Sequence, residues 1–262
     1  MDSSFKGILY PTRLPSFGRF PAPPQVHHLV SWFWIPEWDI APGRSSRQHL
    51  IAFAACNLVV QHDGVELSGP TTRASHQDLS GKGWAVGALL RPAAVPSFTS
   101  RPADLRDGRL MIDAPDLLAH VVEVMGKETT ARGAEAAAVF AAWLLERVPQ
   151  VGQEALLANA MAESISNNPD LVRIADVAQQ LSVSTRTLQR LAVKYVGLSP
   201  SALIRRRRLQ EAANQVRTHP GLELAALATQ FGYADQAHLA NDFQRFLGFT
   251  PSSYQKSLTA PL

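Results

Sequence analysis

Two stretches near the C-terminus decide the fold: residues 174–196, IADVAQQLSVSTRTLQRLAVKYV, and residues 224–247, LAALATQFGYADQAHLANDFQRFL. Each begins with apolar residues at positions i, i+3, i+4 and i+7, which form one face of a two-turn helix. These residues are Ile174, Val177, Ala178 and Leu181 in the first stretch and Leu224, Leu227, Ala228 and Phe231 in the second. The two stripes lie fifty residues apart. The sequence therefore contains an internal repeat.

A short break and a second helix follow each stripe. Ser184 and Asp235 stand at the end of the break, where their side chains suit a helix N-cap. The second helices also share an apolar face, formed by Leu188, Ala192, Tyr195 and Val196 in one copy and by Leu239, Phe243, Phe246 and Leu247 in the other. A short helix, a turn of three or four residues and a second helix predict a helix-turn-helix unit. We expect two such units, over about 174–196 and 224–247.

A third helix should join the two units. Ser199 followed by Pro200 is typical of an N-cap and first helical position, and the helix should run to about Arg217. It would set the distance between the units, which matters because successive major grooves on one face of DNA lie about 34 Å apart.

The basic residues are concentrated in the same part of the chain. Up to Asn167 there are 14 Lys and Arg against 16 Asp and Glu, whereas after it there are 11 against 6. DNA binding requires such a surplus, because Lys and Arg that neutralise phosphates release condensed counterions.

Particular residues in the C-terminal region resemble a known family. They include Arg208-Leu209, Leu227-Ala228, Phe231-Gly232-Tyr233, His238-Leu239, Gly248-Phe249 and Thr250-Pro251-Ser252. Over roughly residues 155–258 the pattern is similar to the C-terminal signature of AraC/XylS-type transcription regulators. The resemblance implies a sequence-specific DNA-binding activator that places two recognition helices in successive major grooves. It also implies RNA polymerase as a partner and no cofactor.

The recognition helix of the first unit should expose Thr185, Arg186, Gln189 and Arg190 once its apolar face is buried. Arg can bond both O6 and N7 of guanine, and Gln can bond N6 and N7 of adenine. The resemblance places Arg186, Gln189 and Arg190 at base-facing positions. The alternative interpretation is a solvated helix face.

The second recognition helix has weaker candidates: Gln236, Ala237 and Asn241, with Arg245 near the edge of the face. Many members of the similar family have an arginine where this chain has Asn241. We therefore expect the first unit to carry more of the specificity, and the second to contribute phosphate contacts and recognition of DNA shape.

Four successive arginines, Arg205 to Arg208, lie on the expected connecting helix. A helix spreads four consecutive residues around most of its circumference, so they cannot all face DNA. For each of them, pairing within the protein and solvation both remain open.

The N-terminal part has a different character. Seven prolines between residues 11 and 42 favour extended arms, turns and edge strands over helix. Strands are predicted at 28–35, 49–55, 58–62 and 84–90, with a hairpin at Asp63-Gly64. Tyr10-Pro11 and residues 87–98 are also similar to the β-rich sensor domain of some family members.

The expected fold class is α+β. Residues 1–112 should form a small antiparallel, cupin-like β-barrel or sandwich. Residues 113–152 should form a helical connector or dimerisation helices, from segments 115–125 and 131–147, and residues 153–262 an all-α DNA-binding domain.

An aromatic cluster stands out in the β-rich part and includes Trp32, Trp34 and Trp84. Three interpretations stay open: the wall of a small-molecule effector pocket, ordinary barrel core, and a dimer or partner surface. A constitutive or protein-regulated factor without an effector is therefore the alternative to a small-molecule sensor. A homodimer is compatible with each.

Catalysis and metal binding are not expected. His27 and His28 are adjacent, so on a strand they would point to opposite faces, and no metal-site or nucleophile motif is present. A cupin-like metalloenzyme fused to a DNA-binding module is the remote alternative. Cys56 is the only cysteine, which suits the cytoplasm, and the longest near-apolar run is about half of a membrane span, so no membrane partner is expected.

Overall fold

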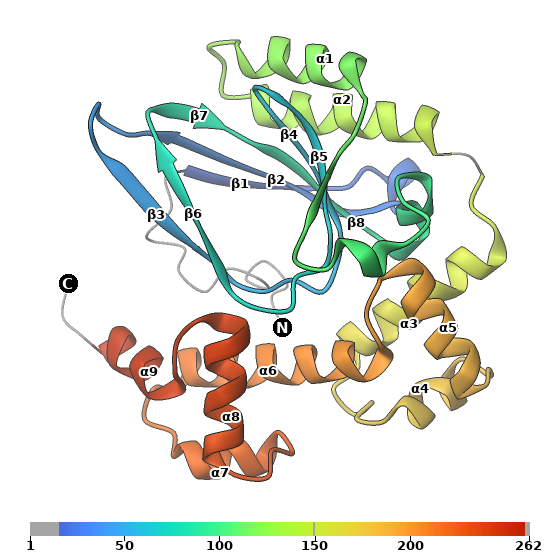
Figure 1. Ribbon diagram of the computed structural model, residues 1–262, viewed down its shortest axis with the longest axis vertical. Helices are drawn as coiled ribbons and strands as arrows, with labels where there is room; N and C mark the ends of the chain where they lie inside the picture. The colour runs from blue at the N-terminus through green and yellow to red at the C-terminus, as the bar shows by residue number, and fades with distance from the viewer. Residues whose placement is uncertain (1–15, 149, 260–262) are drawn as a thin grey trace.

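The computed structural model describes residues 16–148 and 150–259. Tyr10 and Pro11 lie outside these ranges. A β-rich N-terminal part carries helices α1 and α2 on one side, and a string of helices from α3 to α9 runs along another side (Figure 1). The antiparallel β-rich domain and the all-helical C-terminal region that the sequence predicts are both confirmed.

The main sheet is antiparallel with the order β1-β2-β8-β4-β5-β9, and β7 adds to β2. Its strands are β1 (Ser16–Pro21), β2 (Val30–Asp39), β4 (Asn57–Gln61), β5 (Gly64–Ser68), β7 (Lys82–Trp84), β8 (Val86–Leu90) and β9 (Arg109–Met111). A separate ribbon pairs β3 (Ser45–Leu50) with β6 (Ser75–Ser80). The predicted hairpin joins β4 and β5; its two turn residues are His62 and Asp63, and Gly64 is the first residue of β5, paired with Gln61.

The predicted strand at 49–55 is wrong in its bounds, because β3 ends at Leu50. The residues after it leave the ribbon to contact the helical region. Ala52 donates its N–H to the carbonyl of Phe246 at 2.8 Å, and its side chain lies in the core of the second helix-turn-helix unit. These backbone groups are thus satisfied by another domain rather than by a strand.

The proline-rich segment does not give only edge strands and turns. Strand β2, which contains Pro36, lies inside the sheet between β1 and the strands β7 and β8. The pairing of β2 with β8 ends at Trp34, and its pairing with β7 begins at Glu37. Pro36 is tolerated because its missing N–H falls in the gap between these partners.

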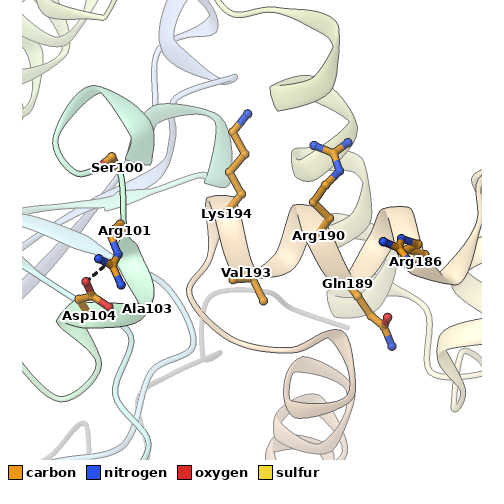
Figure 2. Close-up of a pocket in the computed structure, with 9 residues that line it drawn as sticks. All are labelled: Ser100, Arg101, Ala103, Asp104, Arg186, Gln189, Arg190, Val193 and Lys194. Carbon is orange, nitrogen blue, oxygen red and sulfur yellow. Dashed lines mark ion pairs between the residues drawn. The ribbon is translucent and has the colours of Figure 1, made fainter.

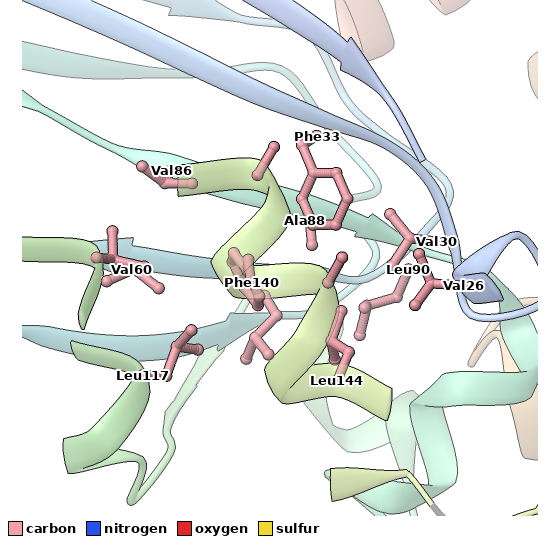
Figure 3. Close-up of a cluster of buried hydrophobic side chains, with 14 of the residues drawn as sticks. Val26, Val30, Phe33, Val60, Val86, Ala88, Leu90, Leu117, Phe140 and Leu144 are labelled. Atoms are coloured by element: carbon pink, nitrogen blue, oxygen red, sulfur yellow. The ribbon is translucent and has the colours of Figure 1, made fainter. Parts of the chain in front are cut away.

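Helices α1 (Pro115–Met125) and α2 (Arg132–Arg147) cover one face of the sheet. Figure 3 shows Phe140 and Leu144 of α2 beside Phe33 of β2 and Leu90 of β8, all of them buried. An ion pair between Arg132 and Glu37 adds a contact between α2 and β2. Residues 115–147 therefore share one hydrophobic core with the sheet, and we describe them as part of the N-terminal domain rather than as a separate connector.

The C-terminal region contains α3 (Gln153–Asn167), α4 (Ile174–Gln180), α5 (Thr185–Tyr195), α6 (Pro200–Thr218), α7 (Leu224–Gln230), α8 (Gln236–Asp242) and α9 (Pro251–Thr259). Helix α8 continues into η6, a π-helical turn over Phe243–Leu247. The two helix-turn-helix units are α4–α5 and α7–α8, as predicted, and α6 connects them. Ser184 Oγ accepts from Thr187 N at 3.0 Å and Asp235 Oδ1 from His238 N at 2.7 Å, which confirms both expected N-caps.

The N-terminal domain contributes an alanine to the core of each unit. Ala93, in the short helix η4 (Pro92–Ser97), packs into the first core, and Ala52 packs into the second. Beside Ala93, the buried Asn159 of α3 accepts from Ala93 N at 2.9 Å and donates to the carbonyl of His28 at 2.8 Å. Both units are therefore attached to the N-terminal domain.

Among residues 16–148 and 150–259, none of the helices combines the length and the apolar character that a membrane crossing requires.

Candidate nucleic-acid interface

Helix α5 presents a polar face to solvent. Leu188, Leu191 and Ala192 are fully buried in the first core, whereas the predicted readers Thr185, Arg186, Gln189 and Arg190 are exposed. Figure 2 shows that Arg190 and Lys194 extend towards one side of the helix and Gln189 and Val193 towards the other. The structure thus brings the four predicted residues of the first unit together on one exposed helix.

Glu154, at the start of α3, binds the basic side of this helix. Arg190 Nη1 donates to Glu154 Oε2 at 2.6 Å and Lys194 Nζ to Glu154 Oε1 at 2.6 Å, while Tyr195 Oη donates to Oε1 at 3.0 Å. Hydrogen bonds from Lys194, Arg190 and Tyr195 lower the pKa of Glu154 to about 2. The carboxylate is therefore charged at neutral pH.

This ion-pair cluster determines whether Arg190 is free to contact DNA. The side chain is 56% exposed, yet it must release or share Glu154 before it can contact a base or a phosphate. Sequence reasoning missed Glu154 because it lies 36 positions before Arg190. Glu154 also lies in the first turn of a helix, where the helix dipole favours an acidic residue, so its presence there did not indicate a distant partner.

The second unit exposes Gln236, Ala237 and Asn241 on α8. Arg245, in η6, turns away from them towards the N-terminal domain, where its Nε donates to the carbonyl of Thr72 at 3.3 Å. Three of the four predicted residues of this unit thus lie on the recognition helix, and the fourth lies at the contact between domains.

The first two of the four arginines on α6 are bound within the protein. Arg205 makes two hydrogen bonds, of 2.6 and 2.5 Å, to the carboxylate of Asp242, which is only 2% exposed. Arg206 is buried and donates to the carbonyls of Ala52 at 2.8 Å and Thr71 at 2.5 Å. Burial lowers the pKa of Arg206 to about 10, so it stays charged at neutral pH. Arg206 therefore holds the second unit against the N-terminal domain.

The other two arginines hold the helical region together. Arg207 is buried and donates to the carbonyl of Leu171 at 3.1 Å and to Glu211 at 3.2 Å. Arg208 Nε donates to the carbonyl of Phe231 at 2.7 Å, at the end of α7. Of the two outcomes that the sequence left open, pairing within the protein therefore applies to all four arginines.

A groove of about 590 Å³ runs between α5 and the N-terminal domain. One wall is formed by α5 and the other by residues at the short helix η5 (Pro102–Leu105). The residues that line it are Ser100, Arg101, Ala103, Asp104, Arg186, Gln189, Arg190, Val193 and Lys194. The exposed face of α5 is thus bordered by a second protein segment.

The three tryptophans proposed for an effector pocket are divided between the two faces of the sheet. Trp32 and Trp34 share the face away from α1 and α2, where the guanidinium of Arg19 lies 3.8 Å from the centre of the Trp32 ring. Trp34 donates to Asn57 Oδ1 at 3.0 Å. Trp84 packs against the core on the helix side, since it pairs with Glu37, which faces α2. Only Trp32 and Trp34 are therefore brought together.

Metal and thiol chemistry find no support in the part of the chain that the structure describes. No group of three or more His, Cys, Asp or Glu residues there is arranged to hold a metal ion. Burial raises the pKa of the Cys56 thiol to about 12, which removes the reactive thiolate at neutral pH.

Comparison with known proteins places this architecture in a family. Residues 177–257 match the family described as "Helix-turn-helix domain", and residues 18–110 match a "Domain of unknown function (DUF6597)". The chain is 30% identical over 107 residues to the HTH-type transcriptional activator AarP of Providencia stuartii, a match that covers 41% of this chain and 78% of AarP. It is also 35% identical over 88 residues to a putative AraC-like transcription regulator of Streptomyces lividans. The chain belongs to the AraC family of transcription regulators.

As an AraC-family member, the protein is a DNA-binding transcription regulator, and these relatives are named as regulators rather than enzymes. The match spans 34% of this chain but only 29% of the Streptomyces protein. Among solved structures, ToxT from Vibrio cholerae O395 is similar with a TM-score of 0.45 and 14% identity, over 87% of this chain and 99% of ToxT.

Proposed function

We propose that this AraC-family regulator recognises its operator mainly through α5, with Arg186 and Gln189 as the principal base readers. One observation carries the proposal. Both side chains are exposed on a helix whose opposite face is fully buried, and neither has a side-chain partner among the described residues. An unpaired Arg and Gln lose no protein contact when they bond a base, and each such contact contributes about 1–3 kcal/mol of discrimination.

Arg190 takes a conditional part in this proposal. Because it is held by Glu154, it contacts DNA only when that carboxylate is released or shared. Thr185 lies at the first position of α5, where it suits a phosphate contact.

The second unit supplies weaker recognition through Gln236, Ala237 and Asn241. Arg245 contributes mainly to the contact between domains, because its guanidinium donates a hydrogen bond to the carbonyl of Thr72. Its part in DNA binding is secondary. The ion pair between Arg205 and the buried Asp242 joins α6 to α8 and so limits movement of the second recognition helix relative to the connecting helix. We infer that the two helices act as one unit on one face of the duplex.

We also propose that the protein activates transcription through RNA polymerase and that it acts in the cytoplasm, where the DNA is. We propose a homodimer as its oligomeric state. A small-molecule effector that acts through the Trp32 and Trp34 face of the sheet is its regulatory part, favoured by the aromatic rings and the Arg19 guanidinium gathered there. A factor that is constitutive or regulated by a protein is the alternative. A thermal-shift screen of metabolites separates them, since an effector raises the midpoint of unfolding.

The test of operator recognition is selection of bound duplexes from a random library with the wild type, Arg186→Ala and Gln189→Ala. We expect each variant to lose preference at one base pair, with a cost of about 1–3 kcal/mol. The matched controls are Arg44→Ala and Gln77→Ala, which remove exposed residues of the same types from the N-terminal domain. Unchanged preference in both α5 variants would show that this face does not read bases.

A further inference from the structure

The short helix η5 of the N-terminal domain is fixed directly beside the recognition helix α5. Gly197, which follows α5, has φ +80°, and a Cβ at this position would lie 2.7 Å from the backbone of Pro102. The glycine therefore allows the two backbones to approach closely. At the other end of η5, Leu105 packs against the core of the N-terminal domain. The segment is thus held from both sides.

The groove between η5 and α5 has a surplus of basic side chains. Its lining includes Arg101 on one wall and Arg186, Arg190 and Lys194 on the other, and two carboxylates oppose these four charges: Asp104 in the lining, and Glu154, which pairs with Arg190 and Lys194. The Arg101 side chain is 77% exposed, and Figure 2 shows it on the wall opposite α5, paired with Asp104. A groove with this excess of positive charge favours a polyanion.

The dimensions of DNA indicate which part of the duplex would meet η5. An α-helix with its side chains is about 10–12 Å across, and the major groove of B-DNA is about 12 Å wide and 8.5 Å deep. A recognition helix therefore fills the groove, and protein that lies beside the helix faces the phosphates at the groove's edge. Here that neighbouring protein is the segment that carries Arg101.

We propose that Arg101, a residue of the N-terminal domain, is a phosphate contact of the DNA interface beside α5. The proposal rests on the proposed placement of α5 in the major groove. Arg101 Nε now pairs with Asp104 Oδ2 at 2.9 Å, and both side chains are more than half exposed. Such a pair contributes little and is readily exchanged for a phosphate. The DNA interface of this regulator is then composite, since the N-terminal domain provides part of it.

The experiment measures the dissociation constant of the full chain across a salt series for wild type, Arg101→Gln, Asp104→Asn and the control Arg44→Gln. The probes are one duplex recovered by selection from a random library and one scrambled duplex of the same length. We expect Arg101→Gln to weaken binding to both duplexes by roughly 3- to 10-fold and to reduce the slope of log K against log salt by about 0.9, as for loss of one phosphate contact. Asp104→Asn should strengthen binding to both, because it removes a negative charge beside the phosphates.

Two results would overturn the proposal. One is that Arg101→Gln has the same affinity and salt slope as Arg44→Gln, which would mean that no phosphate lies there. The other is that Arg101→Gln binds more tightly than the wild type, which would mean that the segment obstructs the duplex. If either occurs while Arg186→Ala still loses base preference, the placement of α5 stands and only the Arg101 contact fails. A wild-type chain that binds no duplex at low salt overturns both proposals.

Discussion

The Glu154→Gln substitution gives a quantitative test of whether Glu154 competes with DNA for the side chains of Arg190 and Lys194. Glu154 holds Arg190 and Lys194 at 2.6 Å each. Exposed ion pairs of this kind contribute about 0.2–1 kcal/mol each. Release of the Arg190 pair alone therefore favours DNA binding by about 0.2–1 kcal/mol. Its loss should tighten binding by roughly 1.4- to 5-fold, since 1.4 kcal/mol is a factor of ten, and loss of the pair with the exposed Lys194 acts in the same direction.

The same substitution should lower the free energy of unfolding by a similar amount, because the pairs stabilise the free protein. The sign of the pH effect follows from the pKa of Glu154, which is lowered to about 2. A carboxyl group whose pKa falls on folding adds stability above its unfolded pKa of about 4.3 and loses it as the pH falls towards 2. Between pH 5 and 8 Glu154 stays charged, so mild acid should not reproduce the effect of the substitution.

The assay is fluorescence anisotropy with a duplex obtained by selection, over a range of salt concentrations, together with urea unfolding. The matched control is Glu163→Gln, which removes a carboxylate from the same helix but breaks a pair with Arg91 of the N-terminal domain. We expect tighter binding and a steeper salt dependence only in Glu154→Gln. Equal affinities in the two variants, or weaker binding in Glu154→Gln, would refute the reasoning and indicate that Glu154 orients Arg190 for DNA.

Three further predictions concern stability and reactivity. Gly248→Ala should destabilise the protein by about 1–3 kcal/mol in chemical unfolding, because Gly248 has φ +82° and a Cβ would collide with His49 of the N-terminal domain, whereas Gly221→Ala, with open space around it, should be nearly neutral. Arg205→Ala should cost about 1–3 kcal/mol in the same assay because the buried Asp242 loses its two hydrogen bonds from this half-exposed arginine, and Arg205→Ala combined with Asp242→Asn should cost less than the two single changes added together. Cys56, whose pKa is raised to about 12, should resist thiol reagents at pH 8 until the chain is unfolded, and rapid labelling of the native protein would contradict its burial.

Much of the helical region was predictable because its signals are local. Apolar residues at helical spacing specify which face of α5 is buried, and Ser184 and Asp235 cap the next helix within three residues. The strands were harder to predict, since their ends depend on pairing. Residues 51–55 have the composition of a strand, yet Ala52 pairs with Phe246 of the helical region instead.

Only the tertiary structure could show which of the basic residues are free to bind DNA and which are bound within the protein. Arg190 is bound by Glu154, and Arg206 by carbonyls of Ala52 and Thr71, more than 130 positions away. The position of Trp84 on the opposite face from Trp32 likewise follows from its register with Glu37. No local pattern encodes these relations.

The sequence by itself thus determined the two helix-turn-helix units and their exposed faces, because helix periodicity and capping act over three or four residues. The tertiary structure decided which charges on those faces are free and which segment of the N-terminal domain borders α5. Ion pairs and domain contacts join residues that are distant in the chain, and their partners exist only once both domains have packed.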